Sequence, residues 1–113
     1  MFQGKCHCGN VMFEVEADLQ STFKCNCTYC VRRAATMLKI LPEKFLLKSD
    51  ESKLGAYGSR DFSKHYFCKN CGINCFTRIK GASGISVVVN VGCLEGIDSF
   101  SLSPTVFDGA NKL

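Results

Sequence analysis

Cysteines are the residues whose type and spacing could do chemistry in this sequence. Seven of the nine fall into three tight clusters, namely Cys6 and Cys8, then Cys25, Cys27 and Cys30, then Cys68 and Cys71. Thiolates are good zinc ligands; four of them close a tetrahedral structural site, whereas three protein ligands leave one position open, as in catalytic sites. The grouping of two, three and two cysteines therefore predicts one closed and one open metal site.

The first and last clusters together supply four thiols. Gly9 follows the first cluster and Gly72 the last, and glycine permits the left-handed backbone that a metal-binding turn often needs. We expect Cys6, Cys8, Cys68 and Cys71 to hold a structural zinc that closes a long loop and stabilises a small core. The alternative is a pair of disulfides, or buried thiols without a metal.

The central cluster can direct three sulfurs to one metal from a single short loop. Either Cys75 or Cys93 could complete it as a fourth ligand, although both are also interpreted as small buried hydrophobes. Zinc on three thiolates is electron-rich, a weak activator of water, and suited to a soft thiol as fourth ligand. We therefore expect a site for a small-molecule thiol, bound as a nucleophilic thiolate. No neighbouring residue is an obvious general base, and His65 is expected to be structural.

The composition is that of one soluble domain, residues 1–113. The first residues lack the pattern of a signal peptide, and no apolar run approaches the roughly 20 residues of a membrane helix. We expect a cytoplasmic protein, and reducing conditions there favour metal binding over disulfides. The net charge of +4 is carried by scattered residues and would be largely offset by metal-loaded thiolates, which argues against nucleic acid as a partner.

The chain between the clusters is rich in short β-like segments separated by Gly, Ser and Asp. Strands are predicted at residues 11–17, 37–41, 45–48, 54–57, 64–67, 74–79 and 85–91, with a hairpin turn at 80–84. Helix is predicted only as one turn at 32–36 and a short 3₁₀ turn at 94–96. This pattern indicates a mainly β domain of short antiparallel strands.

Four motifs in order carry a family resemblance. They are Gly4-x-Cys6-x-Cys8-Gly9-x-Val11-x-Phe13-Glu14, Cys25-x-Cys27-x₂-Cys30, Phe67-Cys68-x₂-Cys71-Gly72 and Val89-Asn90-Val91-Gly92-x-Leu94-Glu95. Together they resemble the glutathione-dependent formaldehyde-activating enzyme family, which also includes centromere protein V. The chain departs from the family pattern at Asn26, where His is common, and at Ala34-Ala35, where Gly is usual. It also lacks the family's Trp-containing tail.

The resemblance implies a zinc-stapled, Mss4-like (β-tent) fold with two Zn²⁺ per chain. It assigns Cys6, Cys8, Cys68 and Cys71 to the structural zinc, and Cys25, Cys27 and Cys30 to the catalytic zinc. The implied activity is that of a carbon–sulfur lyase joining glutathione and formaldehyde into S-(hydroxymethyl)glutathione.

Two alternatives remain open at this point. One is a glutathione carrier without turnover. The other is a binding module with two structural zincs, which could use a surface patch of Tyr29, Arg32, Arg33 and Lys39. The physiological aldehyde and the oligomeric state are also left open.

Overall fold

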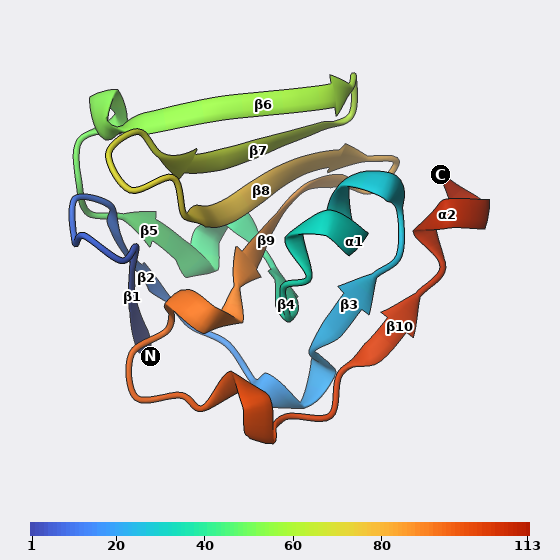
Figure 1. Cartoon of the computed structure of the whole chain (residues 1–113), viewed down its shortest axis with the longest axis horizontal. Coiled ribbons are helices and arrows are strands. Elements are labelled where there is room, and N and C mark those ends of the chain that lie inside the picture. The colour runs from blue at the N-terminus through green and yellow to red at the C-terminus, as the bar shows by residue number, and fades with distance from the viewer.

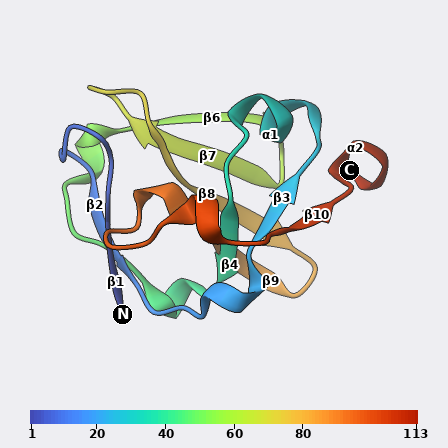
Figure 2. The same ribbon diagram turned by 60° about the horizontal axis from the view of Figure 1, so that its bottom comes forward.

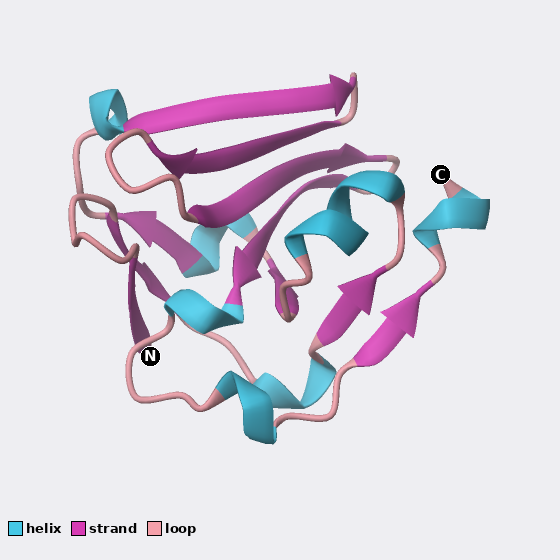
Figure 3. Ribbon diagram, viewed as in Figure 1, coloured by secondary structure: helices cyan, strands magenta, loops and turns pink.

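The structure is a computed structural model that describes residues 1–113, apart from the side chain of Ser59. Short strands dominate it and the helices are brief, as Figure 3 shows. The strands are β1 (Phe2–Lys5), β2 (Met12–Val15), β3 (Phe23–Cys25), β4 (Met37–Ile40), β5 (Phe45–Leu47), β6 (Leu54–Arg60), β7 (Ser63–Cys68), β8 (Asn74–Gly81), β9 (Gly84–Asn90) and β10 (Thr105–Phe107). The α-helices are α1 (Thr28–Arg33) and α2 (Gly109–Lys112). Short 3₁₀ turns lie at Leu19–Ser21, Pro42–Lys44, Glu51–Lys53, Val91–Cys93 and Ser99–Ser101.

The strands described form two sheets. The smaller has the order β1-β2-β5 and the larger the order β10-β3-β4-β9-β8-β7-β6 (Figure 1). Neighbouring strands are antiparallel except β10, which runs parallel to β3. The chain passes between the two sheets at β2–β3, β4–β5 and β5–β6. The small sheet packs on one face of the large one, since Phe13 and Phe45 contact Phe76 of β8. The predicted fold class, a mainly β domain, is confirmed.

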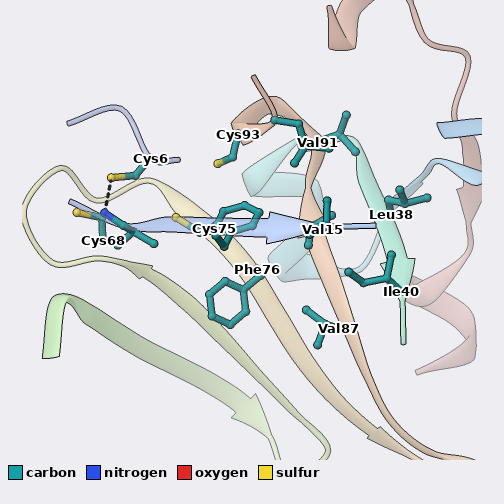
Figure 4. Close-up of a cluster of buried hydrophobic side chains, with 14 residues drawn as sticks. Cys6, Val15, Leu38, Ile40, Cys68, Cys75, Phe76, Val87, Val91 and Cys93 are labelled. Carbon is teal, nitrogen blue, oxygen red and sulfur yellow. Dashed lines mark hydrogen bonds between the residues drawn. The ribbon is translucent and has the colours of Figure 1, made fainter. Parts of the chain in front are cut away.

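The hydrophobic core lies between the two sheets (Figure 4). Phe13 from the small sheet is fully buried, and its ring centroid lies 5.4 Å from that of Phe45 and 6.2 Å from that of Phe76. Phe45 and Phe76 are themselves 4.6 Å apart. This aromatic cluster fixes the small sheet against β8, and the cysteines of the first and last clusters lie at the margin of the same core.

The two faces of the large sheet have different neighbours, because successive side chains on a strand point to opposite sides. The core face carries Leu38, Ile40, Phe76, Val87 and Val89. The opposite face carries Met37, Lys39, His65, Thr77 and Val88, which line a cavity. Residues 86–89 of β9 are all buried, because the strand is covered on both of its faces. The second face of the large sheet therefore borders a cavity, whereas the first borders the hydrophobic core.

All seven predicted strands are present, with boundaries that coincide or differ by up to three residues. The hairpin between β8 and β9 is also confirmed, since Gly81 pairs with Gly84 across a two-residue turn. The prediction of a turn at 32–36 was wrong: α1 begins at Thr28, because the Cys27 sulfur accepts a hydrogen bond from the Cys30 N–H and caps the helix. The 3₁₀ turn predicted at 94–96 lies at Val91–Cys93, where the Asn90 side chain caps it. Strands β1, β3 and β10 were not predicted from the sequence.

None of the helices in the described chain has both the length and the apolar character needed to cross a membrane.

Candidate metal centres and the adjoining cavity

Cys6, Cys8, Cys68 and Cys71 are brought together at one end of the core, with their sulfur atoms within 4.8 Å of one another. Cys8 Sγ lies 3.6 Å from both Cys6 Sγ and Cys68 Sγ. Disulfide sulfurs would be about 2.05 Å apart. Four sulfurs placed tetrahedrally around zinc at about 2.3 Å would be roughly 3.8 Å apart. The spacing therefore fits a metal site and not a pair of disulfides.

Two turns of similar construction present these thiols. The N–H groups of Asn70 and Cys71 donate to Cys68 Sγ at 3.3 and 3.4 Å, and the N–H of Val11 donates to Cys6 Sγ at 3.3 Å. The backbone of Gly9 has φ +85° and that of Gly72 φ +80°, the left-handed conformation expected for both. Such N–H···S contacts favour thiolates, the form in which cysteine binds metals.

Cys25, Cys27 and Cys30 form the second group, again with sulfurs within 4.8 Å of one another. Cys25 ends β3, Cys27 caps α1 and Cys30 lies in its first turn. The Cys27 N–H donates to Cys25 Sγ, and the Cys30 N–H to Cys27 Sγ, both at 3.4 Å. A single strand-to-helix turn thus gathers three thiols that can bind one metal ion.

The thiols within each group differ in how readily they ionise. Burial raises the pKa of Cys30 to about 12 and that of Cys6 to about 11, whereas hydrogen bonds from the backbone at Cys8 and Ile73 lower the pKa of Cys71 to about 6. Burial also opposes ionisation of Cys27, but hydrogen bonds from Cys30 and Cys25 outweigh it and lower the Cys27 pKa. Clustered thiols of high pKa ionise together only when a nearby positive charge stabilises them. A divalent, thiophilic metal such as zinc fits both donor sets.

Cys75 and Cys93 lie apart from the three-cysteine cluster. Both are buried in the core, at the same end as Cys6 and Cys68 (Figure 4). The Cys75 thiol donates to the Ile73 carbonyl and the Cys93 thiol to that of Asn74. Their interpretation as small buried hydrophobes is confirmed, and the described structure places neither as a fourth ligand of the central cluster.

The three-cysteine cluster opens onto a cavity of about 610 Å³. Its wall is largely apolar, with Phe23, Met37, Phe62, Ile79, Val88, Val106 and Phe107 among the lining residues. Arg33, Lys39 and Arg60 add positive charge, and the described lining residues include no aspartate or glutamate. A cavity of this size holds a small organic molecule, and its charge suits an anion.

A hydrogen-bonded chain leads from the cluster along the cavity wall. Arg33 Nη2 donates to Cys30 Sγ at 3.2 Å, while its Nη1 donates to Asn74 Oδ1 at 2.9 Å and to Thr77 Oγ1 at 3.4 Å. Thr77 Oγ1 lies 2.7 Å from His65 Nδ1. The His65 ring is stacked on that of Tyr29, with centroids 3.9 Å apart. The Arg33 guanidinium also lies over the Tyr29 ring, at 5.2 Å.

Comparison with known proteins gives the cluster and the cavity a context. The sequence model of the glutathione-dependent formaldehyde-activating enzyme family matches residues 1–108. The chain belongs to this family. Among solved structures, the crystal structure of a Rhodobacter sphaeroides protein is similar, with 29% identity and a TM-score of 0.84. The match covers 93% of this chain and 99% of that one. The resemblance stated from the motifs is confirmed, and the likeness is consistent with the Mss4-like fold that it implied.

Asn26, which departs from the family pattern, joins the cysteine loop to the C-terminal segment. Its Nδ2 donates to Asp108 Oδ1 at 3.0 Å, and its Oδ1 accepts from the Ala110 N–H at 2.9 Å. β10 pairs with β3 beside it (Figure 2). A Cβ atom on Gly109 would lie 2.6 Å from Cys25 Sγ, so glycine is required for this close approach. The C-terminal segment thus contributes Thr105, Val106, Phe107 and Leu113 to the cavity wall in this member of the family.

Of the four residues predicted as an alternative partner patch, three line the cavity, namely Tyr29, Arg33 and Lys39. Arg32 is exposed, and its side chain donates to Thr28 of its own helix. His65, expected from the sequence to be structural, and Thr77, for which no role was predicted, both line the cavity. The signal that could have found both is strand periodicity, because they occupy the cavity-facing positions of β7 and β8 once the register is known.

Proposed function

We propose that this protein is a zinc enzyme that forms or cleaves the carbon–sulfur bond between a small thiol and formaldehyde or another small aldehyde, with glutathione as the expected thiol. One observation carries the proposal: three clustered thiols, a donor set one short of a closed site, open onto a cavity with cationic and apolar walls. Family membership supports the same chemistry. The cytoplasm, which holds the cell's glutathione pool, is the proposed compartment.

The two cysteine groups have different proposed roles. Cys6, Cys8, Cys68 and Cys71 would hold a structural zinc, and Cys25, Cys27 and Cys30 a catalytic one. When bound to three thiolates, zinc offers a fourth position that suits a soft thiol and stabilises it as the thiolate.

The cavity residues would bind the thiol substrate and shield the reacting groups. Arg33, Lys39 and Arg60 would attract the carboxylates of a thiol such as glutathione. The apolar wall, including Phe62 and Phe107, would limit access of water to the reacting groups.

Cobalt substitution tests the open position directly. The Co²⁺-loaded protein should change its ligand-field bands when titrated with glutathione, because a new sulfur ligand alters the coordination of one ion. Cys27→Ser should abolish this change. Cys75→Ala is the matched control, since it removes a buried thiol outside both groups and should leave the titration unaltered. Bands that stay constant at millimolar glutathione, in a protein holding two ions, would contradict the proposal.

Turnover requires a second measurement. Magnetisation-exchange NMR gives the rate at which formaldehyde and glutathione interconvert with their adduct, with and without protein. An exchange rate above the uncatalysed one establishes the enzyme. Thiol binding without acceleration would instead support a glutathione carrier, and absence of both would leave a binding module with two structural metals.

A further inference from the structure

His65 occupies a position that a purely structural histidine does not need. It lies on β7 opposite Thr77 of β8, is 7% exposed, and lines the same cavity as Cys27 and Cys30. Tyr29 of α1, one of the two residues between those cysteines, covers one face of its ring. The imidazole is therefore held rigidly beside the cysteine loop, with one edge toward Thr77.

The hydrogen bonds of Thr77 determine which ring nitrogen of His65 carries the proton. Thr77 is 2% exposed, and a hydroxyl so buried is expected to have a hydrogen-bond acceptor. Its partners among the described residues are Arg33 Nη1 and His65 Nδ1. A guanidinium only donates, which leaves His65 Nδ1 as the acceptor for the Thr77 hydroxyl proton. Neutral His65 is then protonated at Nε2.

The Nε2–H group of His65 has no hydrogen-bond partner within the described part of the chain. Arg33 Nε is the one described polar side-chain atom that is both fully buried and without a partner, so Nε2 of His65 keeps some exposure, and His65 lines the cavity. A donor presented to a cavity without a partner is available to a ligand oxygen. The neighbouring Arg33 cannot take this role with the same freedom, because its two terminal nitrogens already donate to Cys30, Asn74 and Thr77.

We propose that neutral His65 donates a hydrogen bond from Nε2 to the carbonyl oxygen of the aldehyde substrate and stabilises the negative charge that this oxygen gains during attack. This assignment rests on the proposed function and adds a catalytic residue to it. The hydroxyl of Thr77 acts as a positioning group, since it fixes the tautomer that makes the donor.

The step balances without a redox partner. The sulfur lone pair of the substrate thiolate forms the new carbon–sulfur bond, and the carbonyl π pair moves onto oxygen. That oxygen is held by His65 Nε2–H and then takes a proton from water, while the proton lost earlier by the thiol has gone to solvent. In reverse, the hydroxyl of the adduct loses its proton and the carbon–sulfur bond breaks.

The electrostatics of the site are consistent with a donor in its neutral form. Burial and the Arg33 guanidinium lower the pKa of His65 to about 4, so the ring is uncharged near neutral pH. A preorganised donor that is aimed at a developing oxyanion and shielded from water typically contributes about 10²–10³-fold to kcat.

The tautomer can be read without any activity measurement. Nitrogen NMR of ¹⁵N-histidine-labelled, metal-loaded protein near neutral pH should show His65 protonated at Nε2 and unprotonated at Nδ1. Thr77→Val should convert this into a mixture of tautomers, because the hydroxyl that selects Nε2–H is lost. A wild-type ring protonated at Nδ1 would overturn the inference, whatever the enzyme does.

Two substitutions then test the catalytic role. His65→Gln places an amide N–H near the position of Nε2 and should keep kcat within about 10-fold of wild type. His65→Asn places its amide near Nδ1 and should lower kcat by about 10²-fold, while glutathione affinity measured by Co²⁺ titration stays the same. Equal effects of the two substitutions on kcat would overturn the role. A wild-type protein without turnover would overturn the proposed function as well, whereas turnover with the wrong tautomer would overturn this inference alone.

Discussion

At the scale of single residues, His65 links the cavity to folding stability. Its ordinary pKa is about 6.5, whereas burial and the Arg33 charge hold the folded value at about 4. Between these pH values the unfolded chain binds a proton that the folded chain does not bind. Stability from this group is therefore complete above about pH 6.5 and is lost as the pH falls toward 4.

The loss should approach about 3 kcal/mol at the acid end of that window. Urea denaturation of wild type and His65→Phe across this range checks the prediction. The unfolding free energy of wild type should fall relative to that of His65→Phe as the pH falls, since the variant has no imidazole to protonate. Parallel curves for the two proteins would show that His65 does not titrate in this way.

Gly109 is the second residue with an individual consequence. A methyl group there would lie 2.6 Å from Cys25 Sγ and 3.2 Å from Cys27 Cβ, so Gly109→Ala must displace either the cysteine loop or the C-terminal segment. We expect weaker metal binding at the central cluster, with about 1–3 kcal/mol lost from folding stability.

Competition with a chromogenic zinc chelator measures the metal affinity of Gly109→Ala. Ala110→Gly, at the next position of α2, is the control and should leave affinity unchanged. Wild-type affinity in the Gly109→Ala variant would mean that the segment moves aside at no cost to the cluster.

At the scale of elements, α1 ends in an unfavourable conformation. Ala34 caps the helix with φ 54°, in the left-handed region that glycine adopts without a Cβ penalty, and its N–H donates to the Cys30 carbonyl. Ala34→Gly should relieve about 1 kcal/mol of strain and raise stability by about 0.5–1 kcal/mol.

Chemical denaturation of Ala34→Gly checks this gain. Ala35→Gly is the matched comparison and should not stabilise, because Ala35 is not among the residues with positive φ. An Ala34→Gly variant less stable than wild type would show that the entropy of the unfolded glycine outweighs the relieved strain.

The elements also show what the sequence could and could not predict. Alternating apolar residues predicted most of the strands of both sheets, and the cysteine spacing predicted both groups of thiols that the structure brings together. The start of α1 was missed because a cysteine sulfur serves as its cap, where Ser, Thr, Asp or Asn would be the usual signal. β3 and β10 were missed because each is only three residues long and every residue of β10 is exposed, whereas the equally short β5 is a continuous apolar run. Their pairing depends on tertiary contacts that no local pattern encodes.

The cavity was harder still to predict. His65, Thr77 and Arg33 are 12 to 44 positions apart in the chain and meet only through the register of β7 with β8 and the placement of α1. Period-two alternation says that His65 and Tyr66 face opposite sides of a strand, but not which side holds the core.

At the scale of the whole molecule, the two cysteine groups should differ in their effect on stability. The four-cysteine group joins the N-terminal turn to the β7–β8 turn, 60 positions away, so a metal there closes a long loop. The three-cysteine group spans only β3 and α1. Cys68→Ser should therefore cost several kcal/mol, whereas Cys27→Ser should leave the fold largely intact and lose one metal ion.

Metal analysis combined with thermal melting measures this difference. Removal of metal from wild type by a chelator should lower the melting temperature about as far as Cys68→Ser does. Equal melting temperatures for Cys68→Ser and Cys27→Ser would contradict the division into a stabilising site and a reactive one.

The parallel pairing of β10 with β3 has a consequence for the motions of the protein. It consists of three residue pairs between segments about 80 positions apart, and the side chains of β10 are exposed. Such an edge opens locally at a small fraction of the free energy of global unfolding. The amide protons of residues 105–107 should accordingly exchange with deuterated solvent far faster than those of 86–89 at the centre of the sheet. Each opening would uncover Cys25 and one side of the cavity, giving a ligand a route inward while the core stays closed.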